Sequence, residues 1–191
     1  MRTRLVLPET ITTDRLRLRP YSLDDLDDVL AYAQDPEWAR FLPVPQPYLR
    51  EHGESWLADQ MKRDRERSPL WAIEREGVVV GGINLGHDIE NRTTLMGYSI
   101  APGLWGQGLT TEAASAVIDA VFTHLSDLNK VRASANPKNV ASVRVMEKLG
   151  MSREAWFHQQ CVFRGEVEDE VWYAILREEW ERLHDQAVAP G

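Results

Sequence analysis

The chain of 191 residues is long enough to bury one substantial hydrophobic core, and its 43% hydrophobic and 27% charged residues are typical of a globular domain rather than a disordered chain. The formal net charge of −8 argues against nucleic acid as the main partner and favours amines and other cationic substrates, with an acidic surface that only aids solubility as the alternative. One cysteine, Cys161, together with the lack of a long apolar run and of a signal-peptide core, fits a cytoplasmic protein with no disulfide and no membrane partner.

The first third of the sequence predicts a strand, two helices and a loop. The segment TTDRLRLRPY (12–21) alternates leucine with arginine and predicts a strand with one wet face. Ser22 is expected to cap the helix SLDDLDDVLAYAQ, whose first turn is acidic. Residues 36–49 contain four prolines and large aromatic side chains and predict an ordered loop. A second helix is expected from about Arg50 to Arg67.

The remaining sequence predicts a β meander followed by alternating helices and strands. The strands PLWAIER and VVVGGINLG meet at a hairpin turn, Glu76-Gly77, and TTLMGYSIA ends the meander. A helix is expected from about Thr110 to Leu125, then the strand KVRASA and the helix NVASVRVMEKLG, which Gly150 ends. Two strands around Gly165 close the fold. We therefore expect one α+β domain over residues 1–191, with a frayed tail at 186–191.

Three glycines, Gly103, Gly106 and Gly108, precede the helix expected at Thr110. Glycine costs stability unless the backbone must bend sharply or approach a ligand closely, and the free N–H groups of a helix N-terminus attract anions. A Walker loop would need lysine where the chain has Leu109, and a Rossmann fingerprint does not occur within a meander. From the residues alone, a phosphate-binding loop and a close-packed turn both remain open.

The motifs PGLWGQGLTTEA and NPKNVASVRVMEKLGM, in this order, resemble those of the GNAT N-acetyltransferases. The opening TTDRLRLRPYSLDDL and the late RGEVEDEVWYAILREEW resemble their RimJ/RimL-like subgroup, so the resemblance covers about residues 12–180. It implies a GNAT fold, with a twisted and mostly antiparallel sheet of six to seven strands, flanked by helices and splayed in the middle to hold acetyl-CoA.

The resemblance also implies a function. The expected reaction is acetyl-CoA-dependent transfer of an acetyl group to a primary amine, either a protein N-terminal α-amine or a small-molecule amine. A non-catalytic acyl-CoA-binding sensor is the alternative. No metal is implied, and the protein is expected to be a monomer or a homodimer.

By the same resemblance, the acetyl-CoA site lies at the end of a strand, in the glycine loop and on the helix after KVRASA. The thioester and pantetheine arm are expected at Ser99, Ile100 and Ala101. The pyrophosphate is expected at Leu104, Trp105, Gly106, Gln107, Gly108, Leu109 and Thr110. Asn139 is expected to cap its helix and also to bind the pantetheine arm. Gly103 stands where the family has Gln or Arg, so one side-chain contact to phosphate is lost.

The catalytic residues are less completely defined. Ser142, one turn beyond Asn139, is the candidate general acid, with an inert surface serine as the alternative. Met146 occupies the position of the family's catalytic tyrosine, and Leu95 stands where relatives often carry glutamate. The general base is therefore unassigned, and the candidates are His87, Asp88, Glu90 and His158.

The loop 36–49 is expected to lie beside the open end of the thioester cleft. Its side chains Trp38, Phe41 and Tyr48 are the candidate substrate-binding wall, because prolines limit the freedom of the loop and aromatic faces suit a cationic amine. The alternative is that Trp38 and Phe41 only cap the core. Glu112, in the first turn of its helix, is interpreted as a structural residue that suits the helix dipole.

Overall fold

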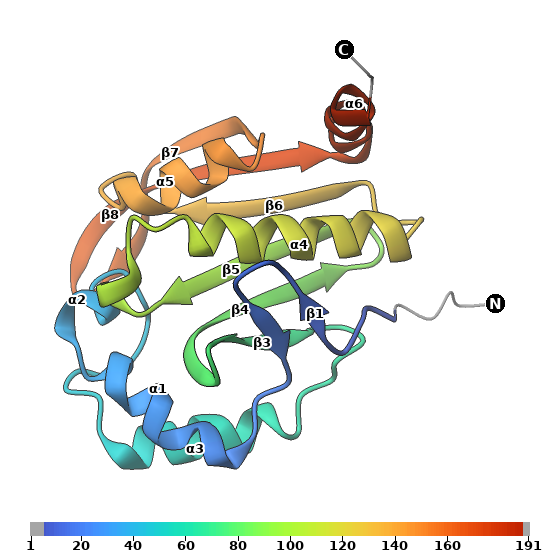
Figure 1. Ribbon diagram of the computed structural model, residues 1–191. Helices are drawn as coiled ribbons and strands as arrows, with labels where there is room; N and C mark the ends of the chain where they lie inside the picture. The colour runs from blue at the N-terminus through green and yellow to red at the C-terminus, as the bar shows by residue number, and fades with distance from the viewer. Residues whose placement is uncertain (1–5, 189–191) are drawn as a thin grey trace.

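One sheet of eight strands organises the chain, and helices cover both of its faces (Figure 1). The computed structural model describes residues 6–188. The N-terminal half contributes β1 (Ile11–Thr12), β2 (Arg17–Arg19), the short 3-10 helix η1 (Leu23–Asp25), α1 (Leu26–Ala33), α2 (Pro36–Ala39), α3 (Arg50–Gln60), β3 (Leu70–Arg75), β4 (Val78–Asp88) and β5 (Thr93–Ile100). The C-terminal half contributes η2 (Pro102–Leu104), α4 (Leu109–His124), β6 (Lys130–Ala135), α5 (Val140–Lys148), β7 (Ser152–Phe163), β8 (Glu166–Leu176) and α6 (Arg177–Val188). Across the sheet the order is β1-β2-β3-β4-β5-β6-β8-β7.

The predicted α+β fold is confirmed, and all seven expected strands are present. The strand count exceeds the expected six to seven because β1, only two residues long, pairs with β2. The two predicted hairpin turns form with left-handed residues at both central positions, Glu76-Gly77 and Arg164-Gly165, as a tight hairpin requires.

Three helical segments differ from the prediction. The helix expected to reach Arg67 ends at Gln60, because residues 61–67 are polar or exposed and bury no side chain. Helix α2 forms inside the predicted loop, where Pro36 takes the first turn and the side chain of Asp35 accepts the N–H of Glu37 at 2.9 Å. Helix α6 was not expected, and it includes residues 186–188 of the predicted frayed tail, whereas residues 189–191 lie outside the described residues.

The sheet splits between β5 and β6, which form a parallel pair. Their register runs from Thr93 opposite Lys130 to Leu95 opposite Arg132, and within the described chain it extends no further. Beyond Leu95, β5 stays paired with β4 as far as Ile100, while β6 is paired with β8. The two strands therefore diverge, which leaves one backbone edge of residues 96–100 without a neighbouring strand and confirms the predicted splay.

Two hydrophobic clusters, one on each face of the sheet, hold the helices in place. The larger cluster joins α4 and α5 to the sheet, and the smaller one packs α1 and α3 against β3 and β4. The adjacent residues Trp71 and Ala72 belong to opposite clusters, as the alternation of a strand dictates. Within residues 6–188, none of the helices combines the length and the apolar character that crossing a bilayer requires.

Strand β7 forms one edge of the sheet, and most of its side chains are exposed. Its register with β8 shifts twice, between Arg153 and Ala155 and between Phe157 and Cys161. The second irregularity is pinned by Asp169, which accepts hydrogen bonds from Trp156 Nε1 at 2.8 Å, from the N–H of Gln159 at 2.9 Å and from the ring of His158 at 3.0 Å. These hydrogen bonds, that of Trp156 first, lower the pKa of Asp169 to about 2.

A cluster of charged side chains joins β2 to η1 and β3. The guanidinium of Arg19 donates to both carboxylate oxygens of Asp25, at 2.8 and 2.9 Å, and its Nε donates to Glu74. Asp25 also accepts the N–H of Ser22, which caps η1. Burial raises the pKa of Asp25, but the hydrogen bonds from Arg19 and Ser22 outweigh it, so that the net shift is downward from 3.8.

We expect Asp25→Asn to lower the free energy of unfolding by about 2 kcal/mol at pH 7, because Arg19 loses its charge-assisted hydrogen bonds to Asp25 and keeps only Glu74 as a carboxylate partner. Urea unfolding followed by circular dichroism measures this difference. The pKa of Asp25 is depressed in the folded chain, so its contribution is present in full above pH 3.8 and is lost as the pH falls through the folded-state pKa. The gap between variant and wild type should therefore narrow in acid.

Asp24→Asn is the matched control, because Asp24 is exposed while its neighbour is buried. We expect it to change the unfolding free energy by less than about 0.5 kcal/mol. Equal effects at the two positions would contradict a special role for the Arg19–Asp25 pair.

Candidate active site

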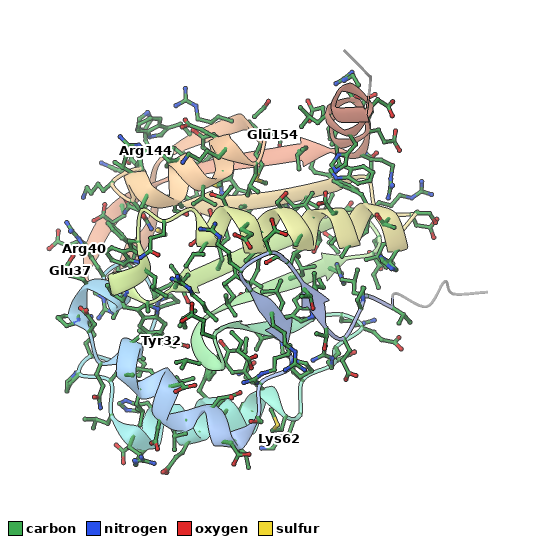
Figure 2. All side chains as sticks on the ribbon, in the orientation of Figure 1. Tyr32, Glu37, Arg40, Lys62, Arg144 and Glu154 are labelled. Atoms are coloured by element: carbon green, nitrogen blue, oxygen red, sulfur yellow. The ribbon has the colours of Figure 1, made fainter. Side chains whose placement is uncertain are left out.

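A cavity of about 550 Å³ opens at the split between β5 and β6. Its walls come from the end of β5, the glycine loop with the start of α4, one side of α5, and α2 with the loop after it. Figure 2 shows that Glu37 of α2, Arg40 just after α2 and Arg144 of α5 lie along the same side of the molecule. All but two of the residues predicted to bind acetyl-CoA line this cavity, and the exceptions are Ala101 and Gln107.

The glycine loop needs glycine for its backbone conformation at two positions. Gly106 and Gly108 have φ of 78° and 77°, in the left-handed region that favours glycine. A Cβ on Gly106 would meet no atom within 4 Å, and one on Gly108 would meet only Arg15 at 3.7 Å, so crowding is not the reason. The backbone at Gly103 does not require glycine, because its φ is not left-handed and a Cβ there would meet no atom within 4 Å.

The N-terminus of α4 is open to an anion. Gly108 is its N-cap residue and offers no side chain to accept the N–H groups of the first turn. The backbone N–H groups of Leu109, Thr110 and Thr111 are therefore free donors at the positive end of a helix of 16 residues. All three residues line the cavity. This arrangement suits a phosphate group.

The loop is anchored from its far side by Arg15 and Glu112. Arg15 Nη1 donates to the carbonyl of Gln107 at 3.0 Å, and its Nε donates to Glu112 at 2.6 Å. Glu112 also accepts the hydroxyl of Thr13 at 2.6 Å. Burial raises the pKa of Glu112, but the hydrogen bonds from Thr13 and Arg15 outweigh it and lower the pKa below 4.5. Glu112 thus ties the β1–β2 hairpin to α4, in agreement with its structural interpretation.

The two predicted ligand residues that do not line the cavity are occupied elsewhere. The side chain of Gln107 contacts Arg75 at 3.1 Å. The N–H of Ala101 donates to the carbonyl of Val80 at 2.7 Å and continues the pairing of β5 with β4. Trp105 does line the cavity, and its indole N–H donates to the carbonyl of Ile100 at 3.0 Å, which fixes the ring at the end of β5.

A pair of hydroxyl groups lies between β5 and α5. Asn139 caps α5 by accepting the N–H of Ser142 at 3.1 Å, which places Ser142 in the first turn. Tyr98 Oη lies 3.1 Å from Ser142 Oγ and 3.2 Å from the carbonyl oxygen of Ser142. Burial raises the pKa of Tyr98 to about 12, so this phenol keeps its proton at neutral pH. Both residues line the cavity, and the pair can hold and relay a proton.

Sequence reasoning did not single out Tyr98. Its hydroxyl meets a residue 44 positions away, and a strand pattern does not reveal such a contact. Met146, at the family's tyrosine position, is fully buried in the larger hydrophobic cluster. No acid group can therefore enter the cavity from that position in this chain.

Basic side chains from α5 and from the residue just before its N-cap line the cavity of this acidic protein. They are Lys138, Arg144 and Lys148. Lys138 is paired with Glu168 at 2.7 Å, whereas Arg144 and Lys148 are four residues apart and hence on one face of the helix. That spacing is visible in the sequence and marks a second group of donors for an anionic ligand.

The predicted substrate-binding wall is placed only in part at the cavity. Trp38 and Phe41 line it, but Tyr48 does not, which corrects the prediction for that residue. Tyr48 is buried in the smaller cluster, with its ring centroid 6.2 Å from that of Trp38, so it supports the indole from behind. Glu37, which the sequence analysis passed over, is the carboxylate among the described residues that line the cavity.

None of the four candidate bases, all within the described chain, lines the cavity. His87 packs inward and burial lowers its pKa to about 4, while hydrogen bonds from Asn91 lower the pKa of Asp88. Glu90 is exposed in the β4–β5 turn. His158 of β7 is also exposed and lies beside Asp169 of β8. In residues 6–188 no group of three or more His, Cys, Asp or Glu side chains is placed to bind a metal ion.

Comparison with known proteins finds a family model and relatives that match most of the chain. Residues 15–152 match the family model described as acetyltransferase (GNAT) domain. The "Uncharacterized N-acetyltransferase YnaD" of Bacillus subtilis (strain 168) is 30% identical over 171 residues, which cover 89% of this chain and 98% of that protein.

Solved structures share the fold. An acetyltransferase (GNAT family) from Bacillus anthracis superimposes with a TM-score of 0.78 at 27% identity and covers 88% of this chain and 99% of its own. RimL, a ribosomal L7/L12 alpha-N-protein acetyltransferase solved with coenzyme A, has a TM-score of 0.79 at 18% identity, over 88% of this chain and 98% of its own. At that identity the likeness to RimL concerns the fold alone.

Proposed function

The chain belongs to the acetyltransferase (GNAT) family and is an N-acetyltransferase, and we propose that it transfers the acetyl group of acetyl-CoA to a primary amine held against α2. One observation carries the proposal. The unpaired edge of β5, the uncapped start of α4 and the Tyr98–Ser142 hydroxyl pair all meet in one cavity. Family membership favours an enzyme over the alternative of an acyl-CoA sensor.

The residues around the cavity fit coenzyme A. The N–H groups between Gly106 and Thr110 would hold the pyrophosphate, and Arg144 with Lys148 would receive further phosphate charge. The unpaired edge of residues 96–100 would hydrogen-bond the pantetheine arm as an added strand does. The structure of RimL with coenzyme A supports this assignment at the level of the fold.

The reaction needs a polarised carbonyl, a neutral amine and a proton for the leaving thiolate. Acetyl-CoA supplies the acetyl group as an activated thioester. The backbone N–H group of Ile100, on the outer edge of β5, would stabilise negative charge on a carbonyl oxygen. Ser142 would give the proton of its Oγ to the leaving thiolate, and Tyr98, protonated at neutral pH and 3.1 Å away, would replace it. The proton lost by the amine would pass to solvent, and one from solvent would return to Tyr98, so that the enzyme returns to its starting state.

The acceptor is proposed to meet Glu37 together with Trp38 and Phe41. Glu37 forms an exposed ion pair with Arg40 at 3.6 Å, and the guanidinium of Arg40 lies over the ring of Phe41, so an arriving ammonium group would displace Arg40 from both. Glu37 can then take up the proton of the amine directly or through water. The net charge of −8 attracts cations over a longer range. Both a protein N-terminus, the acceptor named for RimL, and a small-molecule amine meet these requirements.

The direct test is turnover of acetyl-CoA with a panel of acceptors, measured as release of the free thiol. The panel contains peptides with free N-termini, polyamines and amino sugars, and N-acetylated peptides are the negative control. We expect turnover with primary amines of one class and none with the blocked peptides. Binding of acetyl-CoA without turnover of any amine would support the sensor instead.

Gly108→Ala should weaken acetyl-CoA binding at least about tenfold, because a side chain at φ 77° strains the loop that presents the phosphate donors. Isothermal titration calorimetry measures the dissociation constant, and thermal unfolding checks the fold. Gly103→Ala is the matched control, and we expect a change of less than about twofold, since no contact or left-handed φ requires glycine there. Equal affinities of the two variants would remove the glycine loop from the phosphate site.

Ser142→Ala should lower kcat by about 10- to 1,000-fold while the KM for acetyl-CoA changes little, because only the proton donor is removed. Tyr98→Phe keeps the ring and should also lower kcat, since the hydroxyl of Ser142 loses its hydroxyl partner. Steady-state kinetics at saturating amine separates kcat from KM. An unchanged kcat in Ser142→Ala would exclude this serine as the acid.

A further inference from the structure

The proposed acceptor wall, residues 37–42, continues into a segment that has little structure of its own. After α2 ends at Ala39, the chain runs to Arg50 without a helix or a strand. Its internal backbone hydrogen bonds are short-range, such as Leu42 N–H to Ala39 and Val44 N–H to Leu42. Such a segment needs contacts from elsewhere to hold one shape.

One distant side chain supplies those contacts. Arg164 Nη2 lies 3.2 Å from the carbonyl oxygen of Ala39, 3.2 Å from that of Leu42 and 3.1 Å from that of Val44. Arginine stays protonated in proteins, so each of these contacts is charge-assisted. The segment and its clamp are more than 100 residues apart in the chain, and Figure 1 shows the far end of β7 and β8 beside α2.

The hairpin turn holds Arg164 in place. Arg164 and Gly165 occupy the two left-handed positions of the β7–β8 turn, with φ of 51° and 84°. The guanidinium also lies over the ring of Phe163, 5.2 Å from its centroid. The backbone and the neighbouring ring thus both restrict the direction of the side chain.

We propose that Arg164 is a positioning residue that fixes the acceptor wall and thereby sets affinity for the amine. The proposal rests on the proposed function, which places the acceptor against residues 37–42. The rear of this wall is supported by rings, since Trp38 packs against Tyr32 and Tyr48, with ring centroids 5.2 and 6.2 Å away. Its other end, at Leu42 and Val44, is held by Arg164.

The coenzyme side of the cavity does not depend on this clamp. The glycine loop is anchored by Arg15 and Glu112, and α5 by the Asn139 cap and its packing on the sheet. Loss of Arg164 should therefore loosen the amine side of the cavity and leave the phosphate side unchanged.

The test compares Arg164→Ala and Arg164→Lys with wild type. Hydrogen–deuterium exchange of the free protein reports on residues 39–49, and steady-state kinetics gives the KM for the amine and for acetyl-CoA. For Arg164→Ala we expect at least about tenfold faster exchange in that segment, about a tenfold higher KM for the amine and a KM for acetyl-CoA within about twofold of wild type. Lysine keeps the charge and three donors, so Arg164→Lys should restore part of both effects.

Arg153→Ala is the matched control. Arg153 is also on β7 and also lies over a ring, that of Trp156 at 5.5 Å, but its position is at the other end of the strand. We expect it to change neither the exchange of residues 39–49 nor the KM for the amine.

Three results would overturn the proposal: unchanged exchange of residues 39–49 in Arg164→Ala, faster exchange with an unchanged KM for the amine, or an equal rise of both KM values. The exchange experiment needs no substrate. If wild type turned over no amine at all, the proposed function would fail while the clamp itself was still tested separately.

Discussion

The parallel contact between β5 and β6 lasts for only three residue pairs, and the site depends on this limit. Each strand is held firmly on its other side, β5 by β4 and β6 by β8, so neither can move across to close the gap. The backbone donors and acceptors on the outer edge of residues 96–100 then have no strand partner in the described chain, and the carbonyl of Ile100 is satisfied by the indole of Trp105 instead. A sheet that is complete elsewhere thus keeps one stretch of strand available to a ligand.

Positively charged groups gather in one region of the cavity, although the protein as a whole is acidic. The chain carries a net charge of −8, yet Arg144, Lys148 and the start of α4 give one region of the cavity a positive potential. Glu112 sits in the first turn of the same helix, where its charge would repel an anion, but the guanidinium of Arg15 neutralises it on the far side of the loop. This region of the cavity can therefore attract an anion although the protein as a whole is acidic.

Local sequence patterns predicted most of the fold, and the resemblance to the GNAT N-acetyltransferases selected the residues expected at acetyl-CoA, most of which line one cavity. Strand alternation, the turn residues Glu76-Gly77 and Arg164-Gly165, and the glycines before α4 each act within a few residues, so their consequences are visible in the sequence. Contacts between distant segments were not predicted. The meeting of Tyr98 with Ser142 depends on how β5 and α5 pack, and no local pattern encodes it.

The wall proposed to hold the amine was predicted least well for the same reason. The sequence marked residues 36–49 as an aromatic and proline-rich loop, but it did not show which ring would face the cavity and which would be buried. Tyr48 was assigned to the cavity, and packing against Trp38 places it in the core instead. Glu37 was overlooked because a single acidic residue near a helix start resembles many others on an acidic surface.

The irregular edge strand β7 has a consequence for the protein in a crowded solution. A long, flat, exposed strand is a template on which another molecule can add a strand, and this is a common route to aggregation. The two register shifts of β7, one of them fixed by Asp169, interrupt the regular spacing of its outer N–H and C=O groups. The charged side chains of Arg153 and Glu154 beside the first shift add a further barrier. The edge that the fold leaves open is therefore poorly suited to seed intermolecular β-sheet growth.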